Sequence, residues 1–187
     1  MDTTRSGREE LEGYAGNGTV RWQVLLHRFT GEAVGKHESY GRPPRRLPQL
    51  VGIVPGSAQD PTKPVVLGVI DTSGSLSNRD LQLIAAELEK LAGLYKVIVV
   101  QCDARIRDVS PHRGRIKQIC GRGSTDLRPP LTRRFLQRHR ADVVVYFTDG
   151  FGPAPKRRPV RPVIWCLAAG GQRPAPYGRA VWMHHGI

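Results

Sequence analysis

The sequence VVLGVIDTSGS, residues 65–75, is the feature that most constrains how this chain folds. Every residue from 65 to 70 is apolar or Gly, which is typical of a short strand buried on both faces of a parallel sheet. Such a strand brings Asp71, Ser73 and Ser75 to its C-terminal tip. We therefore expect this tip to be a loop that holds a metal, with the rest of the chain organised around the strand.

Apolar strand-sized segments alternate with amphipathic segments downstream of this strand. A hydrophobic fraction of 39% is adequate for a buried core. The first amphipathic segment, 78–91, is expected to be a helix that ends at Gly93. The order predicts an α/β fold, a three-layer α/β/α Rossmann-like domain of mostly parallel sheet with helices on both faces. We expect parallel strands at 97–101, 143–147, 163–167 and 179–183, helices at 78–91 and 127–139, and one antiparallel edge strand at 104–110.

The residues before position 61 have a different character. Trp22, Leu25, Leu26 and Phe29 have the spacing of an amphipathic helix, so we expect a helix at 20–30 that docks on the main domain. Residues 31–63 are rich in Gly and Pro and predict a largely irregular linker. A chain of 187 residues is too short for two full-sized domains. We therefore divide it into an N-terminal helix and Pro/Arg-rich arm, 1–60, and one main domain, 61–187.

Two carboxylates and several hydroxyls are expected at one edge of the sheet. Asp71 and Asp149 each follow a strongly apolar strand directly, and functional groups in open parallel sheets gather at the carboxyl ends of the strands. Oxygen ligands without Cys or His suit Mg²⁺ or Mn²⁺ and suit zinc poorly. The alternative is that Asp71 and Ser73 cap a helix and Asp149 caps a turn. The predicted metal ligands are Asp71, Ser73, Ser75, Thr125 and Asp149.

These motifs support a resemblance to a known family. DTSGS, a threonine in the Gly-rich loop GRGSTD and a strand that ends in TDG resemble the metal-ion-dependent adhesion site (MIDAS) of von Willebrand factor A domains. In addition, YGRPPRRLP, QCDARI, TDGFGPAP and PVIWCL are similar to the C-terminal half of a bacterial metallopeptidase-like family that is associated with MoxR-type AAA+ ATPases. Arg122 interrupts the continuous Gly run that is usual in that family.

The resemblance implies a function. The serines and the threonine would contact the metal directly, the aspartates would often act through water, and an acidic side chain of a protein partner would take the open position. This predicts a metal-dependent protein-interaction module, an adaptor for a MoxR-type AAA+ ATPase. Longer members of the family carry HExxH, whereas here His37 and Glu38 are followed by Ser39, Tyr40 and Gly41. We therefore expect no enzymatic activity.

Other carboxylates and a basic segment complete the candidate site residues. Asp103 and Asp126 are candidates for contacting the metal ligands without contacting the metal itself; for Asp103 a plain surface turn is the alternative.

The positive charge is concentrated in one segment. The net charge is +13, and residues 105–140 contain ten Arg and one Lys but only two Asp. A nucleic-acid-binding face is thus one alternative function, although Phe135 is the only Phe, Trp or Tyr in this segment that could stack on bases. A non-catalytic subunit or remnant of a metallopeptidase system is another. The basic candidates are Arg105, Arg107, Arg113, Arg115, Arg133 and Arg134.

The sequence also bears on the compartment. No apolar run approaches the roughly 18 to 20 residues that span a bilayer, so we expect no membrane association. The start lacks the apolar core of a secretory signal. The three cysteines lack any CxxC pair, which fits reduced thiols. We therefore expect a cytoplasmic protein.

Overall fold

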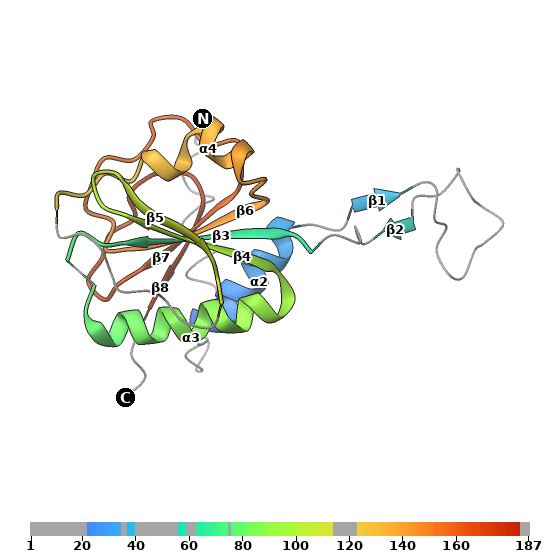
Figure 1. Ribbon diagram of the computed structural model, residues 1–187, viewed down its shortest axis with the longest axis horizontal. Helices are drawn as coiled ribbons and strands as arrows, with labels where there is room; N and C mark the ends of the chain where they lie inside the picture. Colours follow the sequence, from blue (N-terminus) through green and yellow to red (C-terminus); the bar gives the residue numbers. More distant parts are fainter. Residues whose placement is uncertain are drawn as a thin grey trace, which may run out of the picture.

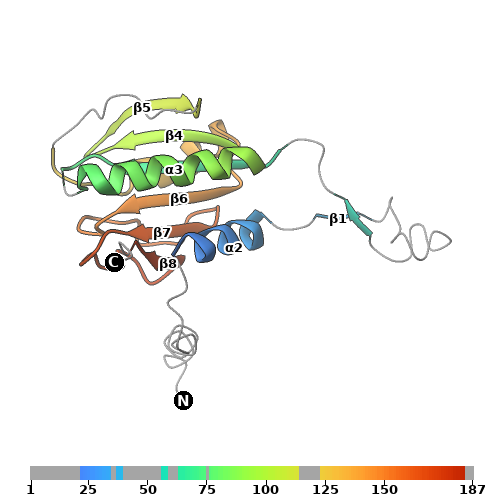
Figure 2. The same ribbon diagram turned by 90° about the horizontal axis from the view of Figure 1, so that it is seen from below.

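Six strands form the central sheet of the computed structural model, which describes residues 22–34, 37–39, 56–58, 63–74, 76–113 and 123–183. The strands lie in the order β5-β4-β3-β6-β7-β8, and only β5 runs antiparallel to its neighbour (Figure 2). This confirms the predicted mostly parallel sheet with one antiparallel edge strand. The bounds are β3 Val65–Asp71, β4 Lys96–Cys102, β5 Ile106–Pro111, β6 Val143–Thr148, β7 Val163–Leu167 and β8 Arg179–Trp182.

Burial explains why these segments form strands in this order. Every residue of β6 and β7 is buried, as is every residue of β3 after the first, so these strands form the middle of the sheet. Their runs of Val and Ile pack well on a pleated surface that is covered on both sides. By contrast, β5 has no fully buried residue and carries Arg107 and Asp108, as suits an edge.

Helix α3, Asn78–Leu94, covers one face of the sheet on the β4 side (Figures 1 and 2). A capping box begins it, because the Ser77 hydroxyl accepts a hydrogen bond from the Asp80 amide and the Asp80 carboxylate accepts one from the Ser77 amide. The expected end at Gly93 is wrong, since the helix continues to Leu94. Tyr95 is the extended residue that ends it, one position before β4 begins.

The opposite face carries two short helices where the sequence predicts one. These are η2, Pro129–Leu131, and α4, Arg133–Arg138. Pro129 and Pro130 have no backbone N–H, and Thr132 between the two helices is extended, with φ −67° and ψ 142°. Leu131 and Leu136 are buried in the core on this face. The sheet and its two helical faces thus make the three predicted layers (Figure 1).

Helix α2, Trp22–Val34, packs beside α3 and covers the β6–β8 half of the same face (Figures 1 and 2). Leu26 and Phe29 enter the core there. The Glu32 carboxylate lies 3.1 Å from the Arg179 guanidinium of β8, and His27 Nε2 lies 2.7 Å from Glu87 Oε1 of α3. No helix among the described residues is long and apolar enough to cross a membrane.

The linker expected at 31–63 has more structure than predicted. Residues 31–34 extend α2. β1, His37–Ser39, pairs with β2, Gly56–Ala58, as an antiparallel two-stranded sheet. The prediction of irregular chain is therefore wrong for these three segments. For residues 31–34 the reason is that Ala33 and Val34 also pack against the core, beyond the last residue of the predicted apolar stripe.

The docking of α2 gives a first testable prediction. Replacing the fully buried Leu26 by Ala leaves a cavity against the sheet and is expected to lower the free energy of unfolding by about 3 kcal/mol. Urea unfolding at equilibrium measures this. The matched control is Val24→Ala on the same helix, because Val24 is 57% exposed and its truncation should change stability by less than about 0.5 kcal/mol. Equal losses in the two variants would contradict the packing of α2.

Candidate metal centre

The candidate ligands lie where the strand order reverses. From β3 the chain proceeds outward through β4 and β5 on one side, then returns to β6 and proceeds through β7 and β8 on the other. β3 and β6 are therefore adjacent central strands, and a crevice outside their carboxyl ends is where open α/β sheets bind ligands. Asp71 is the last residue of β3, and Asp149 follows the last residue of β6.

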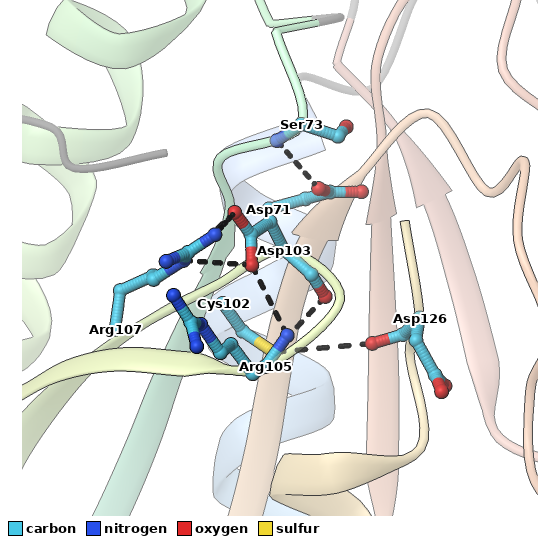
Figure 3. Close-up of polar contacts among 7 residues, drawn as sticks. All are labelled: Asp71, Ser73, Cys102, Asp103, Arg105, Arg107 and Asp126. Carbon is cyan, nitrogen blue, oxygen red and sulfur yellow. Dashed lines mark hydrogen bonds and ion pairs between the residues drawn. The ribbon is translucent and has the colours of Figure 1, made fainter. Parts of the chain in front are cut away.

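The Asp71 carboxylate is buried and held by both oxygens. The Ser73 amide donates to Oδ1 at 3.0 Å (Figure 3), and the Thr148 hydroxyl donates to Oδ2 at 2.7 Å. A carboxylate has about four lone-pair positions, so each oxygen still has capacity for a further contact. The carboxylate is thus fixed in orientation while remaining able to bind a cation or its water.

The electrostatic environment of Asp71 favours a cation. Burial raises the pKa of Asp71 above its ordinary value, and the nearby Asp149 charge raises the pKa further; the hydrogen bonds from Thr148 and Ser73 oppose both effects. The charged form of Asp71 is therefore under-compensated by the residues around it. A positive ion near Asp71 and Asp149 would offset both the desolvation cost of the Asp71 charge and the repulsion between the two carboxylates.

Thr148 is a site residue that the sequence analysis missed. Its side chain is fully buried, its hydroxyl donates to Asp71, and its oxygen accepts a hydrogen bond from the Gly150 amide at 3.0 Å. Thr148 therefore ties the ends of β3 and β6 together. The strand register carries the signal, because Ile70 is paired with Phe147 and the next residues along are Asp71 and Thr148.

The turn after β6 brings Asp149 and Thr125 into one neighbourhood. Asp149 Oδ1 accepts a hydrogen bond from the Phe151 amide at 2.9 Å. Gly152 packs so closely on Thr125 that a Cβ at residue 152 would lie 2.8 Å from the Thr125 methyl carbon. The structure therefore gathers Asp71, Ser73, Thr125 and Asp149 around one edge of the sheet. Ser75 lies outside the described residues.

Asp103 and Asp126 each already have an arginine partner. Arg107 reaches both Asp103 oxygens, at 2.9 and 2.8 Å from its Nε, and the Arg105 amide donates to Oδ1 at 3.1 Å (Figure 3). The Arg107 hydrogen bonds hold the pKa of Asp103 below its ordinary value, although burial opposes this. Asp126 is paired with Arg128 at 2.8 Å, which likewise lowers the pKa of Asp126.

These two aspartates hold the loop that carries Thr125. The Asp126 amide donates to the Asp103 carbonyl oxygen at 3.1 Å. Cys102 Sγ lies 3.8 Å from the Asp126 carbonyl oxygen, a contact that Figure 3 also draws. Through these two contacts the end of β4 holds Asp126 and so fixes the loop next to Thr125.

The predicted basic residues come from separate parts of the molecule. Arg105 lies in the turn between β4 and β5, and Arg107 lies on β5 with its guanidinium on Asp103. Arg133 and Arg134 are exposed on α4. Arg113 is exposed just after β5, and Arg115 lies outside the described residues.

The donor chemistry fits a hard divalent cation. The gathered side chains offer carboxylate and hydroxyl oxygens, which Mg²⁺ and Mn²⁺ prefer. Within the described part of the chain, no group of three or more His, Cys, Asp and Glu comes together in a way that could hold a metal. A cation at this edge would therefore depend on Ser and Thr hydroxyls together with the two aspartates.

Comparisons with known proteins agree with this fold. A family model described as VWA-like domain (DUF2201) matches residues 65–184. An uncharacterised protein of Thermotoga maritima is 33% identical over 178 residues, which are 89% of this chain and 42% of that protein. The chain thus spans less than half the length of that relative. No solved structure is significantly similar.

Proposed function

Because the chain belongs to the VWA-like domain family (DUF2201), we propose that it is a metal-dependent protein-interaction module. The observation that carries this proposal is the buried Asp71 carboxylate at the end of β3, which Ser73 and Thr148 hold in a fixed orientation near the charge of Asp149. A carboxylate in that environment costs stability unless a cation accompanies it. A site that is built at the expense of stability is typical of function.

The residues that would hold Mg²⁺ or Mn²⁺ are Asp71, Ser73, Ser75, Thr125 and Asp149. The bound ion would supply a strong attraction for an additional carboxylate, which forms short charge-assisted contacts. Asp71 and Thr148 orient the donor set, since their hydrogen bond joins β3 to β6. An Asp or Glu of a protein partner is therefore the group that this site would recognise. An adaptor role beside a MoxR-type AAA+ ATPase extends the proposal and rests on the family resemblance of the sequence.

Removal of Asp71 tests the metal directly. Mg²⁺ at about 100 times its dissociation constant would stabilise the folded state by about 2.7 kcal/mol and raise its melting temperature by about 5 to 10 °C. We expect Asp71→Ala to abolish this shift and the corresponding heat in isothermal titration calorimetry. Asp108→Ala is the matched control, because Asp108 is a carboxylate on β5 that is bonded to Ser110. A full Mg²⁺ response in Asp71→Ala would contradict the proposal.

The nucleic-acid alternative is separated by a second pair of measurements. If the exposed Arg133 and Arg134 bind a phosphate backbone, reversing their charge would abolish RNA binding, and binding would fall steeply with salt but not respond to chelator. If the metal-dependent proposal holds, chelator and Asp71→Ala abolish partner binding and the charge reversal does not.

A further inference from the structure

Phe151 is an exposed aromatic residue beside the candidate metal centre. It lies two residues after Asp149 and is 53% exposed. Among the described residues, the other large apolar side chains that are mostly exposed are aliphatic: Val24, Leu94 and Val160. Aromatic side chains contribute strongly to binding when a partner covers them, and they are enriched at the centres of interfaces.

The backbone around Phe151 is fixed from both sides. Its amide donates to Asp149 Oδ1 at 2.9 Å. The preceding residue, Gly150, is buried against the Gln172 carbonyl, and the following residue, Gly152, packs on Thr125. Phe151 is thus held between two candidate ligands, Asp149 and Thr125. Because the backbone is already ordered, binding a partner costs conformational entropy only in the Phe151 side chain and not in the loop.

The chain that follows Phe151 is basic. Residues 150–162 contain Lys156, Arg157, Arg158 and Arg161 and no acidic residue, and these four side chains are exposed. This connection is anchored to the core, since the Pro153 carbonyl accepts from the Leu127 amide at 3.0 Å and the Pro155 carbonyl accepts from the Tyr177 hydroxyl at 2.7 Å. Its positive charge favours an acidic partner segment.

We infer that Phe151 selects the partner of this site: the bound segment places one carboxylate on the metal and a neighbouring apolar side chain on the Phe151 ring. This inference rests on the proposed function and adds a sequence requirement to it. The metal recognises only the acid and would accept any exposed Asp or Glu. Phe151 gives the discrimination, because an apolar neighbour covers the ring and a polar neighbour leaves its own hydrogen-bonding groups unsatisfied there.

Peptide display tests this requirement. The probe is a phage library of peptides with one fixed Asp and randomised flanking positions, selected on the full chain in Mg²⁺ and eluted with EDTA. On the wild-type chain we expect Leu, Ile, Met, Phe or Trp to be enriched next to the fixed Asp. Synthetic versions of the selected peptides are expected to bind Phe151→Ala at least tenfold more weakly, and Phe151→Leu with intermediate affinity.

The controls separate partner selection from folding and from metal binding. Val160→Ala is the matched variant, because Val160 is 52% exposed in the same connection and its truncation is expected to leave peptide affinity unchanged. Phe151→Ala is expected to retain the melting temperature of the wild type and its shift with Mg²⁺. Selection of the same apolar neighbours by Phe151→Ala, or no apolar enrichment among EDTA-eluted peptides, would overturn the role of Phe151 alone. If EDTA released no peptides and the bound peptides came off only on denaturation of the protein, the proposed function would be overturned as well.

Discussion

Gly150→Ala is expected to lower the free energy of unfolding by about 4 kcal/mol or more, which places it among the most damaging single substitutions available. Gly150 has φ +81°, a backbone conformation that costs a residue with a Cβ about 1 to 2 kcal/mol. In addition, a Cβ there would overlap the Gln172 carbonyl oxygen. Neither backbone can move freely, because the Gln172 amide donates to the Asp149 carbonyl oxygen at 2.9 Å. Urea unfolding measures the loss.

Gly170→Ala isolates the contribution of the overlap. Gly170 has nearly the same φ, +79°, and an added Cβ there meets nothing within 4 Å. Its replacement should therefore cost only the conformational part, about 1 to 2 kcal/mol. If the two variants lost the same stability, the close approach of residues 150 and 172 would be contradicted.

Asp103→Asn is expected to lower the free energy of unfolding by about 3 kcal/mol at neutral pH, because removing the carboxylate charge leaves the Arg107 guanidinium without its counter-ion. The Asp103 side chain is fully buried and Arg107 is 29% exposed, so Arg107 would recover part of the loss by turning to solvent. The loop that carries Thr125 is held by the hydrogen bond from the Asp126 amide to the Asp103 carbonyl oxygen. If the proposed site binds Mg²⁺, its affinity for the ion is therefore expected to fall together with stability.

The effect of Asp103→Asn also depends on pH in a defined direction. The pKa of Asp103 in the folded state lies below its ordinary value of 3.8. A carboxyl group of this kind contributes stability that is fully present above its unfolded pKa and is lost as the pH falls through its folded pKa. The difference in the free energy of unfolding between wild type and Asp103→Asn should therefore have its full size at about pH 7 and become smaller as the pH falls below about 4.

Asp126→Asn is the matched control for Asp103→Asn. Asp126 also pairs with an arginine, but its side chain is 21% exposed and that of Arg128 is 58% exposed. Solvent screens such a pair, and its removal should cost less than about 1 kcal/mol. A loss in Asp126→Asn as large as that in Asp103→Asn would show that burial does not distinguish the two pairs.

The sheet was predictable from the sequence because its central strands are continuous apolar runs. Strands at 65–70, 143–147 and 163–167 have few alternatives, since each must be covered on both faces, and all three appear in the structure. The same logic places Asp71 and Asp149 at one edge, because both follow such strands. Whether these residues bind a metal stays a prediction.

Other features depend on contacts that periodicity does not encode. Thr148 reads as the last residue of a strand, and its role as a donor to Asp71 follows only from the register between β3 and β6. The pairing of Asp103 with Arg107 requires the turn between β4 and β5 to fold back. The break at Thr132 separates residues whose apolar spacing suggests one helix, because the two prolines before it favour a short 3₁₀ turn.

The contact between α2 and β8 has a consequence for how the chain acquires its structure. Arg179 of β8 stacks on the Phe29 ring, 4.6 Å from its centroid, and pairs with Glu32. Helix α2 is synthesised before β6, β7 and β8, the strands that it covers, so its apolar side stays exposed until these strands have left the ribosome. Closing so long a loop favours slow folding. During synthesis, Leu26 and Phe29 are therefore a natural target for a chaperone that binds exposed apolar segments.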